Sequence, residues 1–382
     1  MATTKVTTDV IDMSGNAGGL TWVKGTTAQR TTTTIGDLRE NTETKRTEVY
    51  TDETGTAEWR NLKETTAASL DSEYLVVAGG GGAGTGSSGG GGGGAGGYLT
   101  NFGGTKITLT SGTAYNITVG TGGAGLPNEN GGIATSGGNS IFSGTGISTL
   151  TASGGGGARN GSGSGADGGS GAGGQGLQTA GSANGTPVTQ GNDGGIGSTP
   201  DSDIGGGGGG ADGAGQPGGT RTSANDGKGG AAASNSITGT AVNYAGGGGG
   251  GVCDFGNNGS NTGQGQAVGA NAGGDGGVSQ DPNSYPAGPA YANGSNADIN
   301  TGSGGGGGSR SQGSTEATGG NGSSGIIIIR NITPSATFTA GVVVNGTTTS
   351  AGQSVNGDTT NMPSGEYFYS ITTAASSATI TF

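Results

Sequence analysis

The chain has 382 residues, of which 99 are glycine, while hydrophobic residues make up 27% and aromatic residues 4%. This composition excludes a conventional side-chain core for most of the chain, because an ordinary domain contains about 45–50% apolar residues and only about 7% glycine. The formal net charge of −12 argues against a nucleic-acid partner, because phosphate contacts require lysine and arginine.

Residues able to do chemistry are scarce. The chain has no histidine and one cysteine, Cys253, which excludes Ser-His-Asp triads, Cys-His pairs and an intrachain disulfide. We interpret Cys253 as a small packing residue beside Phe255. No apolar signal segment opens the chain, and its longest aliphatic run, residues 326–329, is too short to span a membrane. We therefore expect a non-enzymatic protein made in a cytoplasm, without cofactor, metal or membrane insertion.

Composition divides the chain into three parts. Six of the glycines lie in residues 1–70 and five in residues 331–382, which leaves 88 of the 99 in residues 71–330. The predicted domains are therefore an N-terminal segment over 1–70, a glycine-rich body over 71–330 and a C-terminal module over 331–382. The expected fold is mainly β and irregular, with no significant helix.

The first part predicts short β-hairpins. Apolar and polar residues alternate between clusters of turn residues from residue 36 to residue 62, which is the sequence pattern of hairpins. Four large side chains are the candidates for packing and for attachment to a partner: Trp22, Leu38, Tyr50 and Trp59. They are too few for an independent core, so we expect self-association or docking on a larger partner.

The glycine-rich body is bounded by two apolar runs, residues 74–78 and 326–329. Short, β-prone runs that are apolar throughout are typical of strands buried on both faces. We expect these two runs to pair in space. A further hairpin is predicted between residues 106–109 and 114–119, around the turn at Ser111, Gly112 and Thr113.

Between these runs lie irregularly spaced blocks of consecutive glycines: 79–82, 89–94, 154–157, 205–210, 246–251 and 304–308. We interpret them as left-handed helices with three residues per turn, which make no internal hydrogen bonds. Packed side by side, such polyglycine-II-like helices can bond to one another through the backbone, and only glycine allows so close an approach. The alternative is a disordered Gly/Ser linker.

Two features of the body could take part in binding. The loop over residues 281–291 has two tyrosines and three prolines, so Tyr285, Pro286 and Tyr291 are candidates for receptor contact; the alternative is a rigid turn or a contact between subunits. Asp-Gly pairs at Asp167, Asp193, Asp212 and Asp275 are interpreted as turns. Calcium binding is the alternative there, although the strict period of calcium-binding repeats is missing.

The C-terminal part predicts a small β module that could trimerise. Residues 342–344 run into Asn345-Gly346, a dipeptide strongly favoured in two-residue hairpin turns. Residues 367–371 and 378–382 alternate as strands do.

Several stretches resemble the glycine-rich module of bacteriophage tail and fibre proteins: residues 73–82, 96–98, 114–120, 137–142, 150–157 and 322–330. Residues 36–62 look like a hairpin found near the start of many marine and cyanobacterial phage structural proteins. The resemblance implies a homotrimeric fibre in the virion, attached by its N-terminal part to other tail or capsid proteins. It also implies distal recognition of a host surface glycan or outer-membrane protein. Unlike T-even-type adhesins with packed polyglycine helices, this chain has its own N-terminal segment and a C-terminal β module beyond its glycine-rich body. Either the C-terminal module or the glycine-rich loops could therefore form the distal tip.

Three functions remain open on this basis. The first is a phage fibre or adhesin that displays loops to the host. The second is a capsid-decorating or tail-assembly component without a receptor. The third is a glycine-rich ice- or wall-associated protein, which the N-terminal hairpin pattern disfavours.

Overall fold

The computed structural model describes residues 23–29, 38–43, 46–51, 58–61, 68–85, 89–127, 132–160, 163–185, 190–198, 204–219, 225–254, 273–277, 292–311 and 317–382. The chain forms two compact units, Met1–Thr66 and Ala67–Phe382. The described residues are mainly β, and the one helical element among them is a single 3-10 turn at Thr27–Gln29. The predicted mainly-β fold is confirmed.

The N-terminal unit contains one four-stranded sheet. Its strands, in spatial order, are β1 (Val23–Gly25), β2 (Leu38–Asn41), β3 (Arg46–Thr51) and β4 (Glu58–Asn61). β2, β3 and β4 are successively antiparallel, as the hairpin pattern predicts. β1 pairs in parallel with β2, a contact that local alternation does not indicate.

The larger unit contains two large sheets, and residues of both build its larger apolar cluster. The first has the order β20-β19-β22-β17-β5-β6, with β7 pairing with β5, and the second has the order β11-β10-β8-β23-β18-β21. The strands of the first are β5 (Ser69–Val77), β6 (Tyr98–Thr100), β7 (Ile107–Thr110), β17 (Ile326–Asn331), β19 (Val343–Val344), β20 (Thr347–Thr348) and β22 (Tyr367–Thr373). Those of the second are β8 (Ala114–Thr118), β10 (Ser140–Gly144), β11 (Ile147–Ala152), β18 (Ser335–Phe338), β21 (Gln353–Asn356) and β23 (Ala378–Thr381).

Three short two-stranded sheets lie elsewhere in this unit. They pair β9 (Gly132–Ile133) with β12 (Arg159–Asn160), β13 (Ala233–Asn235) with β14 (Val242–Tyr244), and β15 (Cys253–Asp254) with β16 (Arg310–Ser311).

The two apolar runs that bound the glycine-rich body are neighbours in the first sheet. β5 and β17 pair antiparallel, with Val77 opposite Ile326 and Glu73 opposite Arg330, which confirms the predicted pairing. The two strands bury side chains on both faces. Val76, Ile327 and Ile329 contribute to one apolar cluster, whereas Leu75, Val77, Ile326 and Ile328 contribute to another that includes Tyr244 and Phe368. Burial on both faces explains why these runs are apolar throughout.

The hairpin predicted between residues 106–109 and 114–119 is wrong. β7 pairs with β5, and β8 pairs with β10 and β23, so the two strands belong to different sheets. The turn between them, in which Gly112 has a φ of 76°, passes the chain from one sheet to the other. Local alternation predicts both strands, but their partners come from distant parts of the chain.

The strands of residues 331–382 are shared between both sheets. β19, β20 and β22 belong to the first sheet, and β18, β21 and β23 belong to the second. The hairpin predicted at Asn345-Gly346 is confirmed, since β19 and β20 flank it and both turn residues have positive φ, 47° and 75°. Residues 331–382 and the glycine-rich body are parts of one compact unit, because sheet hydrogen bonds cross the change in composition at residue 330.

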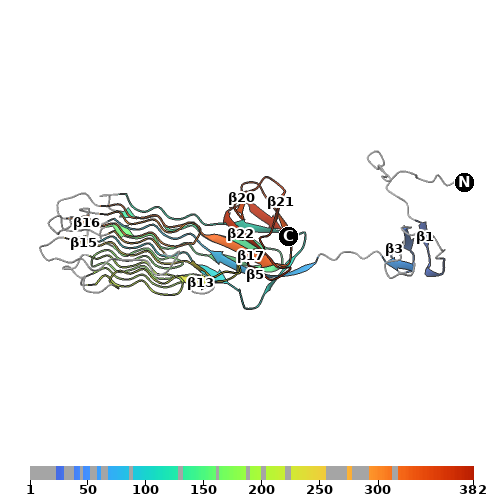
Figure 1. Cartoon of the computed structure of the whole chain (residues 1–382), viewed down its shortest axis with the longest axis horizontal. Helices are drawn as coiled ribbons and strands as arrows, with labels where there is room; N and C mark the ends of the chain where they lie inside the picture. Colours follow the sequence, from blue (N-terminus) through green and yellow to red (C-terminus); the bar gives the residue numbers. More distant parts are fainter. Residues whose placement is uncertain are drawn as a thin grey trace. The chain divides into compact units, whose positions relative to one another are not determined.

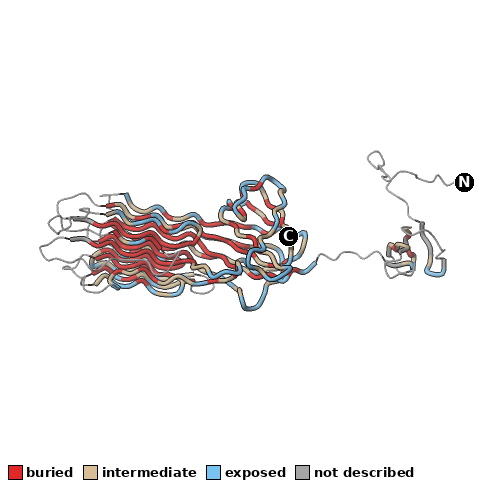
Figure 2. Tube along the Cα trace, in the orientation of Figure 1, coloured by how far each residue is buried: buried red, intermediate tan, exposed pale blue. Residues whose placement is uncertain are grey.

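The glycine-rich body consists of extended segments, here called threads, that run side by side away from the two sheets (Figure 1). Most of their length is buried (Figure 2), although they carry few side chains. The central thread, residues 89–97, shows how they are held. Its N–H groups donate in turn to carbonyl oxygens of three different threads. The donor and acceptor pairs are Gly92 with Gly206 and Ala95 with Gly209 for the first thread, Gly93 with Gly305 and Gly96 with Gly302 for the second, and Gly94 with Gly156 and Gly97 with Ser153 for the third.

 The same partner thread therefore returns at every third residue, which is the repeat of a helix with three residues per turn.

The carbonyl groups of the central thread complete the pattern by accepting from three further threads. Gly90 and Gly93 accept from one thread, Gly92 and Ala95 from a second, and Gly91, Gly94 and Gly97 from a third. The donors are, in the same order, Gly251 and Gly248, then Gly173 and Ser170, then Gly84, Gly81 and Ala78. One thread is thus bonded to six neighbours, and the predicted polyglycine-II-like body is confirmed.

Glycine is required in these threads by the closeness of their neighbours. A Cβ atom built on Gly93 would lie 2.1 Å from the carbonyl oxygen of Gly81, and one built on Gly92 would lie 2.1 Å from that of Gly248. Neither residue has a positive φ, so backbone conformation does not impose glycine here. Alanine is accommodated at Ala95, where the thread meets the apolar cluster around Tyr244.

We predict that Gly93→Ala lowers the free energy of unfolding by about 3 kcal/mol or more, because the new methyl group cannot fit without separating backbones. Gly104→Ala is the matched control. Its Cβ would lie 3.3 Å from the nearest atom, the Asn101 oxygen, so the change should be no more than about 1 kcal/mol. Denaturant unfolding of both variants measures the difference, and equal effects would contradict the close-packed lattice.

We also predict that stability falls at alkaline pH. Burial, and secondarily the neighbouring Tyr98, raises the pKa of Tyr244 to about 12 from an ordinary value of 10.0. The folded state therefore holds this proton more tightly than the unfolded state, so the contribution of Tyr244 to stability is fully present below about pH 10 and is lost as pH rises toward 12. Thermal unfolding against pH should show a shallower decline for Tyr244→Phe than for the parent chain. An unchanged decline would refute this assignment.

Candidate functional site

Polar side chains complete the hydrogen bonding at the edges of the glycine-rich body. Where no further thread follows, a side-chain oxygen accepts from the backbone N–H instead. Examples are Asn139 Oδ1 with Gly154 N (2.8 Å), Gln190 Oε1 with Ser153 N (2.7 Å), Ser136 Oγ with Gly157 N (3.1 Å), Asp167 Oδ1 with Ser182 N (2.7 Å) and Asp193 Oδ1 with Ala183 N (2.6 Å). These caps satisfy groups that would otherwise remain open to another chain.

Asp167 and Asp193, two of the aspartates in the Asp-Gly pairs, thus cap backbone N–H groups of a neighbouring thread. Across the described part of the chain, no group of three or more His, Cys, Asp or Glu side chains is placed to hold a metal ion. Cys253 lies in β15, and its side chain is outside the description, as is Phe255.

One edge of the body forms a groove of about 470 Å³. Three neighbouring threads build it, because Gly319 N–H donates to Leu126 O (3.0 Å) and Gly294 N–H donates to Thr318 O (3.0 Å). Glycine and small polar residues predominate in the lining, which consists of Gly125, Leu126, Pro127, Asn293, Gly294, Ser295, Asn296, Thr318, Gly319 and Asn321. None of these residues carries a charge.

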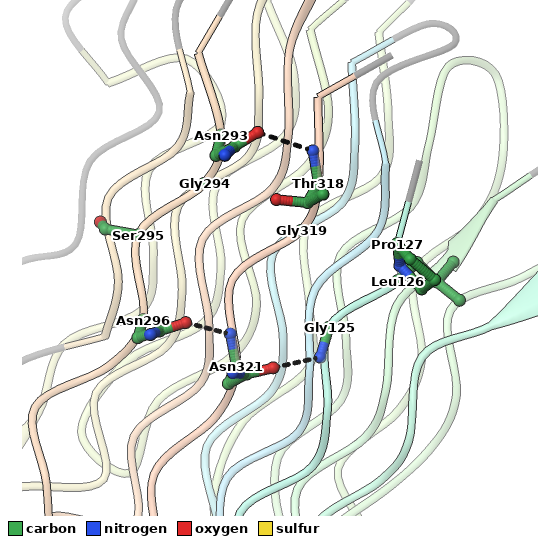
Figure 3. Close-up of a pocket in the computed structure, with 10 residues that line it drawn as sticks. All are labelled: Gly125, Leu126, Pro127, Asn293, Gly294, Ser295, Asn296, Thr318, Gly319 and Asn321. Atoms are coloured by element: carbon green, nitrogen blue, oxygen red, sulfur yellow. Dashed lines mark hydrogen bonds between the residues drawn. The ribbon is translucent and has the colours of Figure 1, made fainter. Parts of the chain in front are cut away.

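Three asparagines bridge these threads in the same manner. Asn293 Oδ1 accepts from Thr318 N (2.9 Å), Asn296 Oδ1 from Asn321 N (2.8 Å) and Asn321 Oδ1 from Gly125 N (2.8 Å). Figure 3 shows these side chains reaching across the threads, with Leu126 and Pro127 at the side of the groove. Because each carbonyl oxygen is held by a backbone N–H, the orientation of each amide is fixed.

The amide nitrogens of these asparagines have no hydrogen-bond partner among the described residues, and neither does the Thr318 hydroxyl. Asn293, Asn296 and Asn321 are exposed. The groove therefore offers amide donors and one hydroxyl to solvent. Sequence analysis did not identify it, although the three-residue spacing of Asn293 with Asn296 and of Thr318 with Asn321 matches the helical repeat and was available as a signal.

In the N-terminal unit, two of the four predicted packing residues come together. The rings of Tyr50 and Trp59 lie 5.5 Å apart between centroids, and Arg39 Cζ lies 5.6 Å from the Trp59 ring centroid. Leu38 pairs with Val49, so strand alternation puts it on the opposite face. Trp22 lies outside the described residues.

A buried ion pair supports this aromatic pair. Arg39 Nε lies 3.7 Å from Glu48 Oε2, and Asn41 Nδ2 donates to Glu48 Oε1 at 2.9 Å. Arg39 Nη2 also donates to the Thr26 carbonyl (2.8 Å). These side chains are nearly inaccessible to solvent, so charge and hydrogen bonding, rather than an apolar core, organise this small sheet. Sequence analysis did not identify the pair.

The candidate receptor-contact residues Tyr285, Pro286 and Tyr291 lie outside the described residues. Their proposed role stays a prediction.

A sequence model of a glycine-rich domain matches residues 51–331. The chain belongs to this glycine-rich domain family. No curated protein and no solved structure matches the chain. Among the described residues of this glycine-rich domain protein, no helix is long and apolar enough to cross a membrane.

The caps can be tested at Asn321. We predict that Asn321→Ala lowers the free energy of unfolding by about 0.5–1.5 kcal/mol, because the Gly125 N–H loses its acceptor. Asn321→Asp keeps a side-chain oxygen at that position and should retain most of this stability. Denaturant unfolding compares the two variants, and faster amide exchange at Gly125 in the alanine variant alone is the local signature. An equal loss in both variants would show that the oxygen is not the stabilising group.

Proposed function

We propose that the chain is a non-enzymatic structural protein of a bacteriophage virion, of the tail-fibre or adhesin type. In this proposal the N-terminal part attaches to other virion proteins, and the glycine-rich body presents its loops to the surface of the host. The observation that carries the proposal is the bundle of hydrogen-bonded threads, held at one end by the two sheets (Figure 1).

A bundle of this kind is suited to rigid display. Neighbouring threads such as 78–84 and 89–97 are antiparallel, as their hydrogen bonds show. Each thread is bonded along its length to neighbours on several sides, which opposes bending. Variation in the connecting segments would leave these bonds in place, as a surface that adapts to different hosts requires.

The two-unit organisation also supports attachment through the N-terminal part. Met1–Thr66 forms a compact unit by itself, with a four-stranded sheet whose outer strands, β1 and β4, each have one described sheet partner. Such edges can pair with a strand from another protein. A homotrimer is the expected assembly, and it would multiply weak contacts with the host by avidity.

The second candidate is a capsid-decorating or tail-assembly component without receptor binding. The uniform backbone lattice favours it equally, because a rigid body serves as a spacer or a brace as well as a display platform. The two candidates differ in whether the isolated protein engages the host.

Two measurements test the proposal. Antibodies against the full chain should label intact particles of the phage whose genome carries the gene, and absence of label would contradict both candidates. The soluble chain, added in excess to host cells, should reduce adsorption of those particles. Labelled particles with unchanged adsorption at saturating protein would favour the component without a receptor.

The same adsorption assay addresses the tyrosine-rich loop. We expect Tyr285→Ser with Tyr291→Ser to reduce competition several-fold, because the aromatic contact area is lost. Tyr50→Phe, which keeps its ring and lies in the separate N-terminal unit, is the control and should compete as the parent chain does. Undiminished competition by the double variant would remove this loop from the recognition surface.

A further inference from the structure

We propose that the groove between residues 125–127, 293–296 and 318–321 binds a neutral, hydroxyl-rich polymer, namely an uncharged polysaccharide. This inference rests on the proposed function in supposing that the natural ligand belongs to a host surface. It concerns the side of the glycine-rich body rather than the predicted loop over residues 281–291.

The first step in the argument is that backbone N–H groups along the groove are not available to another glycine thread. A further thread would bond through free backbone N–H or C=O groups. The N–H groups of Thr318, Asn321 and Gly125 already donate to asparagine oxygens, so these three donors are not available to it. The asparagines thus cap the N–H groups along this edge of the bundle.

The second step is that the capping asparagines present amide N–H donors in fixed positions. Each asparagine uses its oxygen inside the bundle and retains an amide nitrogen with no described partner. Asn293 and Asn296 are three residues apart on one thread, so their donors repeat at about 9 Å along it, given a rise of about 3.1 Å per residue. A donor row with a regular repeat matches an extended, repeating ligand better than a compact one.

The third step concerns charge. The lining contains no charged residue, and the whole chain carries a net charge of −12, which disfavours an anionic ligand. The lining also contains no carboxylate to hold a cation. Sugar hydroxyls and ring oxygens accept from amide N–H groups, and the Thr318 hydroxyl can both donate and accept.

The last step concerns shape. Leu126 and Pro127 border the groove on the side away from Asn293 and Asn296 (Figure 3). Their apolar surfaces can contact the C–H groups of a sugar ring while the amides bond its hydroxyls. Polar groups that fix orientation beside an apolar wall are the usual composition of a small-molecule site.

The test uses the full chain and a triple variant, Asn293→Asp with Asn296→Asp and Asn321→Asp. Aspartate keeps the oxygen that caps each backbone N–H but removes the amide donor, so the bundle is retained while the groove loses its donors. Asn139→Asp is the matched control, because Asn139 Oδ1 caps Gly154 N–H in the same way (2.8 Å) outside the groove. Thermal unfolding confirms that each variant is folded.

Binding is measured by affinity electrophoresis and calorimetry with dextran, mannan and hydroxyethylcellulose as neutral probes, and with alginate as an anionic probe. We expect the parent chain and Asn139→Asp to bind at least one neutral probe, and the triple variant to bind it at least about tenfold more weakly, given three lost donors. Equal binding by the triple variant, preference for alginate, or no binding to any neutral probe would overturn the inference. Self-association that the triple variant abolishes would overturn it in favour of a contact between copies.

The adsorption assay separates this inference from the proposed function. If the parent chain and the triple variant both compete with phage adsorption equally, the proposed function stands and the groove has no part in it. If the parent chain binds a neutral polysaccharide but does not compete, the groove stands as a saccharide site and the receptor-binding role fails.

Discussion

The hydrogen bond between the backbones of neighbouring threads is the interaction on which this structure depends. It forms only where two backbones approach so closely that a Cβ on Gly93 would lie 2.1 Å from a carbonyl oxygen. Each such bond contributes little by itself, about 0.5–1.5 kcal/mol, so the bundle relies on their number. Glycine loses more backbone entropy on folding than any other residue, and the six-neighbour arrangement offsets this loss by pairing nearly every N–H and C=O of a thread.

Where the threads join the sheets, a core of packed apolar side chains gives way to a core of hydrogen-bonded backbone. β5 packs Leu75 and Val76 on opposite faces, and two residues beyond its end Gly79 is already enclosed by backbone. Ser140 joins the two regions, since its hydroxyl donates to Val77 O (2.8 Å) and accepts from Gly120 N (2.9 Å). The apolar sheets fix the ends of several threads, and this reduces the entropy that the glycines must lose on their own.

Because the interior of the bundle is almost uniform glycine, any specific binding must come from side chains on its surface. Threads of glycine are chemically alike, so the side chains that distinguish one part of the bundle from another lie at its edges, as in the groove of Asn293, Asn296 and Asn321. There one amide serves two purposes, with its oxygen closing the lattice and its nitrogen facing solvent. The fold by itself is compatible with display, bracing or decoration, and function is therefore argued from edges and loops.

Local conformations can be predicted from the sequence alone. Runs of glycine without a collagen repeat predict extended threads, the apolar residues 74–78 and 326–329 predict doubly buried strands, and Asn345-Gly346 predicts its turn. Apart from the pairing of residues 74–78 with 326–329, the neighbours of strands and threads follow only from the tertiary structure. β7 and β8, adjacent in sequence, pair in different sheets, Arg39 meets Glu48 beneath Trp59, and the asparagines of three threads form one groove. Glycine threads carry no side chains that could select one partner thread over another, so any thread can bond to any other. Which threads become neighbours is therefore set by the strands, turns and capping side chains that fix their ends.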